Sequence, residues 1–260
     1  MDFSNFFLYT EKAVSEGLDV GFSLFGSGHI KWLVATVVAA VLVTGKYAGF
    51  SEDRRTRTRK NMALYLLFSE IAKDTMIVLV GADIMGYLPL HLCSFAIFGL
   101  LVDAFNPEQK ITGSLLAYGF APGALSALLF SNWTELPVFM NAMSIHSFIF
   151  HAVIVIYFVM RFANGEIEIT YSGVWKTLLA MIIVSIPVLI FDIVTDTNYL
   201  FLYKGQDGSP LEFIWDILGV RFGLPGFLAG YFLLAIVVLH ICFVLYSYFS
   251  LAIRPKNNVN

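Results

Sequence analysis

The chain has 260 residues, of which 58% are hydrophobic and 13% charged, and its formal net charge is −3. An average soluble domain has about a quarter of its residues charged, so this composition excludes an ordinary soluble protein and indicates several membrane-spanning helices. The two cysteines, Cys93 and Cys242, both lie in apolar runs, which argues against a disulfide framework.

Seven apolar segments have the length of a membrane-spanning helix, which needs about 20 mostly apolar residues. They predict one all-α membrane bundle with spans at 30–50, 62–86, 88–105, 112–130, 136–161, 174–196 and 226–252. We expect residues 1–28 to form an outer interfacial segment and residues 29–260 to form a single membrane domain.

One further helix is expected in an outer loop near residues 209–222. Its start is indicated by Ser209 as N-cap, Pro210 at the first helical position and Glu212 three residues after the cap.

The placement of Lys and Arg predicts the orientation, because cytoplasmic connections are enriched in these residues. The first connection contains Arg54, Arg55, Arg57, Arg59 and Lys60. Other basic residues recur in every second connection, so the N-terminus is expected outside and the C-terminus in the cytoplasm, in a multi-pass protein of the cell membrane. Anionic lipid headgroups account for the basic run, and no nucleic-acid partner is expected. No special role is expected for Glu166 and Glu168 in a cytoplasmic loop.

Polar and ionisable side chains within the predicted spans are candidates for a functional site, because they are costly in lipid. We expect several of them to line one cavity that opens toward the outer half of the bilayer. The candidate site residues are His29, His91, Cys93, His146, His151, Asp192, Asp196, Asn198 and Tyr199.

The second predicted span also carries Glu70, Lys73 and Asp74. Glu70 can pair with Lys73 three residues later, and Glu70 shares a helix face with Asp74. Two interpretations remain open for this group. It is either a neutralised contact between helices, or an ion or proton relay.

Four sequence elements carry a resemblance to a known family. They are His29, Leu88-Pro89-Leu90-His91-Leu92, the spacing His146-x4-His151 followed by Ala152-Val153-Ile154-Val155, and Thr197-Asn198-Tyr199-Leu200-Phe201-Leu202. In order and spacing they resemble the YwaF-type bacterial integral membrane family, over roughly residues 28–215. That family is distantly similar to the eukaryotic transmembrane-protein-164 group of phospholipid acyltransferases. The resemblance implies lipid acyl transfer or hydrolysis, with Cys93 as the nucleophile.

The residues themselves suit this chemistry. A thiolate can take an acyl group from an ester, while a histidine accepts the thiol proton and later protonates the leaving group. The expected catalytic residues are Cys93, His91, His146 and His151, with His146 or His151 as the base. The expected substrate-binding residues are His29, Asp192, Asp196, Asn198 and Tyr199, and Asn198 or Tyr199 could donate to the oxyanion. Membrane phospholipids or lysolipids are the expected partners, and no cofactor is expected.

Two other classes of function stay open. In a metal-dependent membrane hydrolase, three of His29, His91, His146 and His151 would hold zinc, although the chain has no HExxH motif. A non-enzymatic transporter or sensor is the second class. The sequence Ala121-Pro122-Gly123 indicates a break in the fourth span, but no matching break marks the second half expected of a transporter.

Overall fold

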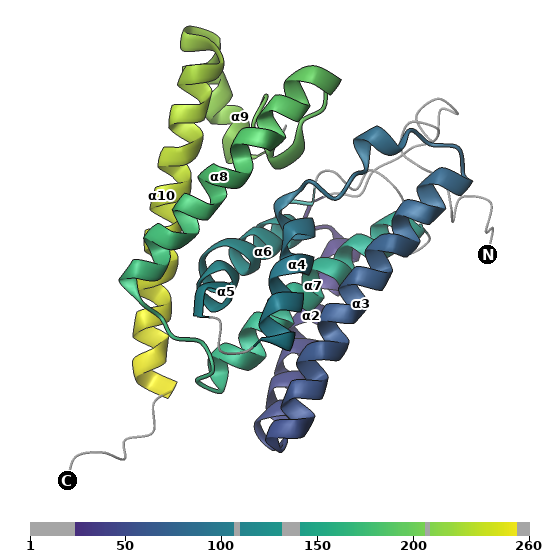
Figure 1. The fold of residues 1–260 in the computed structure, drawn as a ribbon, viewed down its shortest axis with the longest axis vertical. Coiled ribbons are helices and arrows are strands. Elements are labelled where there is room, and N and C mark those ends of the chain that lie inside the picture. The colour runs from purple at the N-terminus through teal and green to yellow at the C-terminus, as the bar shows by residue number, and fades with distance from the viewer. Residues whose placement is uncertain (1–23, 107–109, 132–140, 206–208, 254–260) are drawn as a thin grey trace.

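The computed structural model describes residues 24–106, 110–131, 141–205 and 209–253, and every regular element in these ranges is helical (Figure 1). The long helices are α2 (Ser27–Ala48), α3 (Glu52–Leu79), α4 (Leu92–Phe105), α7 (Ala142–Ala163), α8 (Tyr171–Thr195) and α10 (Val220–Ile253). Between α4 and α7 lie α5 (Lys110–Leu115), η2 (Leu116–Phe120) and α6 (Ala121–Leu129). The short elements are η1 (Ile84–Gly86), η3 (Tyr199–Phe201), α9 (Pro210–Ile214) and η4 (Trp215–Gly219).

Five helical stretches of the described chain are long and apolar enough to cross a membrane. They are α2, α5–α6, α7, α8 and the stretch Pro210–Leu251 that contains most of α10. The prediction of seven such spans is therefore wrong. The apolar part of α3 carries Glu70, Lys73 and Asp74, and α3 ends at Leu79 rather than at residue 86. Helix α4 has 14 residues, or about 21 Å at 1.5 Å per residue, against a hydrocarbon core of about 30 Å.

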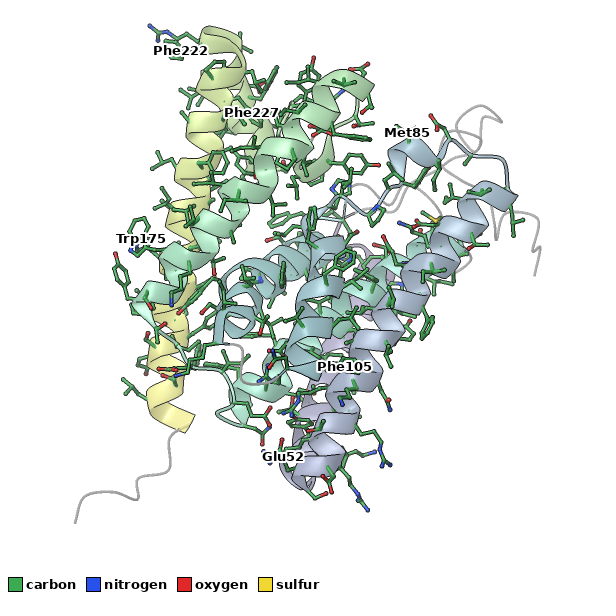
Figure 2. All side chains as sticks on the ribbon, viewed as in Figure 1. Glu52, Met85, Phe105, Trp175, Phe222 and Phe227 are labelled. Carbon is green, nitrogen blue, oxygen red and sulfur yellow. The ribbon has the colours of Figure 1, made fainter. Side chains whose placement is uncertain are left out.

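Helices α7 and α5–α6 form the centre of the bundle. In each, 56% of the most apolar stretch is buried, against 11% in α2. Helices α2, α3 and α6 pack against α7, α4 packs against α3, and α8 packs against α5 and α10. Figure 2 shows Glu52 and Met85 at opposite ends of the bundle. The outward-facing apolar side chains of the outer helices, such as Phe222 and Trp175, suit contact with lipid.

The fourth predicted span is continuous rather than broken. Pro122 has no N–H to donate, and the residues before it form the wider π turn η2, in which the Ala121 N–H donates to the Leu116 carbonyl. All five residues of η2 are buried. Gly99 of α4 leaves room for this turn, because a Cβ at that position would lie 2.3 Å from the ring of Phe120.

The expected helix start at Ser209 is confirmed, since its Oγ accepts a hydrogen bond from the Leu211 N–H at 3.2 Å. The helix continues through α9 and η4 until Gly223, whose φ of +65° breaks the helical path inside α10. The part of α10 that follows Gly223 packs closely against α9 and η4. A Cβ at Gly230 would lie 2.6 Å from the Ile214 side chain of α9. The proposed division at residues 28 and 29 stays a prediction, because residues 1–23 lie outside the described ranges.

A buried ionic cluster, centred on the carboxylate of Glu166, ties the α2–α3 end of the bundle together. Four side chains donate to that carboxylate, namely Tyr47 (2.9 Å), Arg59 (3.0 Å), Arg161 (3.1 Å) and Arg55 (3.2 Å). Arg161 also pairs with Asp103 of α4, which accepts a further hydrogen bond from Tyr157 at 2.7 Å. Glu166 therefore joins α2, α3 and α7, a role that its position in a loop did not indicate.

Candidate functional site

Cys93 lies in the first turn of α4, after the non-helical segment 88–91. Cys93 is a free cysteine, and it is half-buried. His91 is the N-cap residue of α4, and its ring lies 4.9 Å from that of Tyr199, centroid to centroid. The predicted helix start at residue 88 is thus four residues too early. His91 lies immediately before the first residue of α4 and not within the helix.

The carboxylate of Glu70 joins three helices next to Cys93. Its Oε1 accepts hydrogen bonds from Lys73 Nζ at 2.8 Å and from Ser94 Oγ of α4 at 3.2 Å. Its Oε2 lies 3.6 Å from Nε2 of His146 on α7. The expected pair between Glu70 and Lys73 is therefore present, but the group also contacts α4 and α7 and belongs to the candidate site.

Lys73 extends this cluster to the segment before α4. Its ammonium group donates to the Tyr87 carbonyl at 3.0 Å. The next N–H, that of Leu88, donates to the Tyr199 hydroxyl at 2.8 Å, and this hydroxyl donates to the Met85 carbonyl at 2.6 Å. Burial raises the pKa of Tyr199 to about 12, so its hydroxyl stays protonated at neutral pH.

The two histidines of α7 differ in their hydrogen bonding. His151 is buried, and its Nδ1 lies 2.7 Å from the Ser147 carbonyl. His146 Nδ1 is also buried but has no hydrogen-bond partner. The side chain of Asn141 caps α7, which begins at Ala142 rather than at residue 136. His146 therefore lies about 6 Å along the helix from its first residue, at 1.5 Å per residue.

His29 lies apart from this cluster, at the contact between α2 and the end of α6. Its ring is fully buried, and its Nε2 lies 2.6 Å from the Leu128 carbonyl oxygen. Its Nδ1 accepts a hydrogen bond from the Phe25 N–H at 2.9 Å, so the ring proton is on Nε2. Nε2 therefore joins α2 to α6, and Nδ1 holds the segment that precedes α2.

Asp192 organises the turn that follows α8. This fully buried residue accepts hydrogen bonds at its Oδ1 from the Thr197 hydroxyl and from the Tyr199 N–H, each at 2.8 Å. Leu200, in the same turn, has a φ of +53°, which is costly for a side chain of this kind. Tyr231 of α10 donates to the Leu200 carbonyl at 3.0 Å and helps to hold the turn.

Asp196 and Asn198 also shape this turn. Asp196 ends α8 in the left-handed conformation, with a φ of +56°. The Asn198 side chain accepts from the N–H groups of Tyr203 and Lys204 and donates to the Lys204 carbonyl. One N–H of the Asn198 amide is therefore engaged in the loop, as is the Tyr199 hydroxyl, and the assignment of either residue to an oxyanion stays a prediction.

The described residues give no support to the zinc alternative. Within residues 24–106, 110–131, 141–205 and 209–253, no three His, Cys, Asp or Glu side chains are placed to hold a metal ion. The histidines proposed as zinc ligands have different neighbours. The His29 ring is hydrogen-bonded to the Leu128 carbonyl of α6, whereas the His91 ring lies against that of Tyr199.

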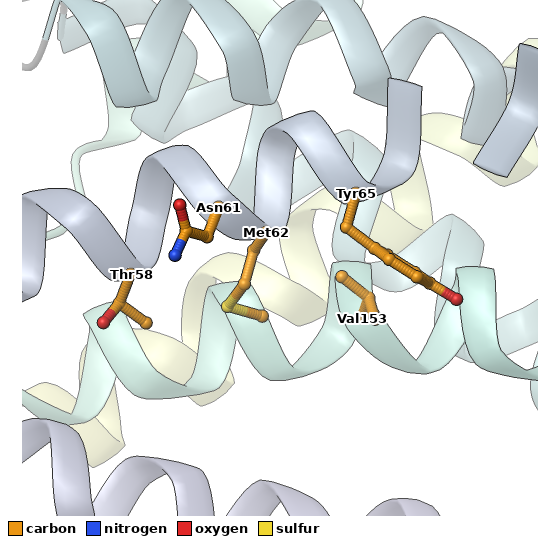
Figure 3. Close-up of a pocket in the computed structure, with 5 residues that line it drawn as sticks. All are labelled: Thr58, Asn61, Met62, Tyr65 and Val153. Atoms are coloured by element: carbon orange, nitrogen blue, oxygen red, sulfur yellow. The ribbon is translucent and has the colours of Figure 1, made fainter. Parts of the chain in front are cut away.

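A shallow groove of about 330 Å³ lies between α3 and α7, on the same helices that carry Glu70 and His146 (Figure 3). Its lining combines apolar and polar side chains, namely Thr58, Asn61, Met62, Tyr65 and Val153. None of the residues proposed for the site from the sequence lines this groove.

A bundle of apolar helices that encloses a carboxylate, a histidine and a cysteine defines a multi-pass integral membrane protein with a polar site. Comparison with curated proteins and with solved structures gives no match. The model of the TMEM164 family matches residues 24–250, and the chain therefore belongs to the TMEM164 family. This match agrees with the resemblance to the transmembrane-protein-164 group, and the YwaF-type assignment stays a prediction.

Proposed function

We propose that this protein transfers a fatty acyl chain from a membrane phospholipid to an acceptor lipid through a thioester at Cys93. The observation that carries the proposal is the position of Cys93, one residue before the serine bonded to Glu70 in the cluster that includes His146. Membership of a family linked to acyltransferase activity supports it.

The reaction would proceed in two steps, the acylation of Cys93 and the transfer of the acyl chain to the acceptor. In the first, a histidine takes the Cys93 proton, the sulfur bonds to the ester carbon, and the ester C–O bond breaks. The proton then passes to the departing lysophospholipid oxygen. In the second, the histidine takes the proton of an acceptor hydroxyl, which attacks the thioester, and the proton returns to the sulfur. If water were the acceptor, the same site would release a free fatty acid.

The distribution of Arg and Lys indicates on which side of the membrane the reaction would occur. The Arg-rich α2–α3 connection is expected in the cytoplasm, and Figure 2 places Glu52, at the start of α3, at the opposite end of the bundle from Met85. Cys93 lies on the segment that follows Met85. The reaction is therefore assigned to the outer leaflet of the cell membrane.

The test uses purified protein in liposomes that contain a phospholipid with a labelled acyl chain. Cys93→Ala should abolish the release and transfer of the label. Cys93→Ser should retain little activity, since an alcohol needs stronger base assistance than a thiol. The wild-type protein should form a covalent adduct with the mass of one acyl chain, and hydroxylamine should remove it.

Cys242→Ala is the matched control, because Cys242 is the second cysteine and packs in the apolar core. This variant should transfer the acyl chain at the wild-type rate. Full activity of Cys93→Ala would overturn the proposed function.

A further inference from the structure

We propose that the groove between α3 and α7 binds one anionic phospholipid, with the lipid phosphate at Arg54 and Arg57 and an acyl chain in the groove. Glu70, which contacts the residue after Cys93, lies about 24 Å from Arg54 along α3 at 1.5 Å per residue. The lipid site is therefore separate from the Cys93 cluster and does not depend on the proposed function.

Two arginines at the start of α3 carry charges that the protein itself does not neutralise. Arg55 and Arg59, the other two arginines of this segment, both form ion pairs with Glu166. Arg54 and Arg57 are exposed, and neither forms an ion pair with any described residue. A guanidinium group binds a phosphate through paired N–H donors. Arg54 and Arg57 are therefore available to an anionic headgroup.

The face of α3 that carries these arginines leads into the groove. Thr58 follows Arg54 by four residues, so the two are adjacent on the helix surface. The same spacing separates Arg57 from Asn61, and both Thr58 and Asn61 line the groove (Figure 3). The rest of the lining lies further along α3 and on α7, and consists of Met62, Tyr65 and Val153. The order is charged, polar and then apolar, which is also the order of phosphate, glycerol ester and acyl chain in a phospholipid.

Asn61 supplies a hydrogen-bond donor that has no partner among the described residues. Thr58, by contrast, donates to the Arg54 carbonyl at 2.8 Å. Asn61 directly precedes the apolar run that starts at Met62, which places its amide at the boundary between headgroups and hydrocarbon. An unpaired amide is costly at that depth, and an ester carbonyl of a phospholipid would accept its N–H.

A lipid fits this groove better than a soluble phosphate does. Soluble phosphate could contact the arginines, but only an acyl chain would also cover the apolar lining. The Arg-rich end of the bundle is expected on the cytoplasmic side, where anionic lipids are concentrated. The diffuse attraction of a basic surface for such lipids needs neither Asn61 nor a groove, so substitutions can distinguish it from a built site.

The test is native mass spectrometry of the detergent-purified protein during titration with dioleoyl phosphatidylglycerol. This lipid should occupy one site that phosphatidylcholine with the same chains fills at least about fivefold more weakly. Arg54→Gln should weaken binding at this site about fivefold, because one basic residue beside an anionic headgroup contributes roughly that factor. Asn61→Leu removes the amide, keeps the size of the side chain and should weaken binding about fivefold as well. Both residues are exposed, so both variants should fold.

Two controls separate a built site from a diffuse attraction. Lys176→Gln removes one positive charge from an exposed position near the start of α8, which is expected on the same side of the membrane. It should leave binding unchanged, because Lys176 does not line the groove. Glycerol phosphate carries the charge of the headgroup without acyl chains, and it should not displace the lipid.

Unchanged binding in Arg54→Gln or in Asn61→Leu would overturn the inference, and so would an equal weakening in Arg54→Gln and Lys176→Gln. Displacement of the lipid by glycerol phosphate would also overturn it, because the arginines would then hold a soluble anion. The measurement involves no acyl transfer and no change at Cys93. It can therefore fail while the Cys93→Ala transfer experiment succeeds, and the two proposals are judged separately.

Discussion

At the scale of single residues, hydrogen bonding distinguishes histidines that look alike in the sequence. His29 and His146 both lie near the N-terminal ends of apolar helices. His29 uses both ring nitrogens within the protein, whereas the buried Nδ1 of His146 has no partner. We therefore expect a structural role for His29 and a chemical one for His146.

Replacement of His29 by alanine should lower stability and leave the chemistry intact. The variant leaves the Leu128 carbonyl without its donor, which costs about 1–3 kcal/mol when the group is buried. Thermal unfolding in detergent measures this loss, and acyl transfer is then compared per folded molecule. His240→Ala, on the outer helix α10, is the control. A drop in the turnover of folded His29→Ala protein would place this histidine in the reaction instead.

Asp192 should tolerate asparagine but not alanine. An asparagine oxygen can still accept from the Tyr199 N–H and the Thr197 hydroxyl, the two bonds made by Asp192 Oδ1. Alanine removes both and should cost about 1–3 kcal/mol. Proteolysis of the turn after α8 would detect its loosening. Equal stability of the two variants would contradict this view of the turn.

At the scale of helices, the sequence predicts their existence better than their ends. An apolar run shows where a helix can be buried, but backbone geometry and caps decide where it stops. Helix α7 begins at its Asn141 cap, and α3 ends before Gly81, whose φ is +78°. The sequence does identify Cys93 and His146 as candidates. It misses the role of Ser94 and the direction of Glu70, because their contact depends on how α3 packs against α4.

Removal of one partner from the ionic cluster at the α2–α3 end should destabilise the bundle. Arg161→Met removes one partner and leaves the charge of Asp103 buried, a change that typically costs about 3–5 kcal/mol. The melting temperature in detergent should fall accordingly. Lys110→Gln is a useful comparison because its pair with Glu168 is exposed, and its melting temperature should not change. A small effect of Arg161→Met would show that the cluster relaxes or admits water.

At the scale of the whole molecule, the orientation in the membrane can be tested by labelling. In a protein without Cys93 and Cys242, Asp53→Cys introduces a thiol at the exposed start of α3. It should be protected from an impermeant maleimide applied to intact cells, since this end is expected in the cytoplasm. Gly86→Cys lies in open space at the end of η1 and should react. The reverse pattern would invert the topology and assign the reaction to the inner leaflet.

The bond between Tyr231 and Leu200 has a consequence for the order of events during synthesis. The two residues are 31 positions apart, and at about 5–20 residues per second the ribosome needs about 2–6 s to cover that distance. By then the helices that carry Cys93 and His146 have already been made. We therefore expect a stalled or truncated nascent chain to hold the reactive thiol in the membrane before the turn around Tyr199 is closed.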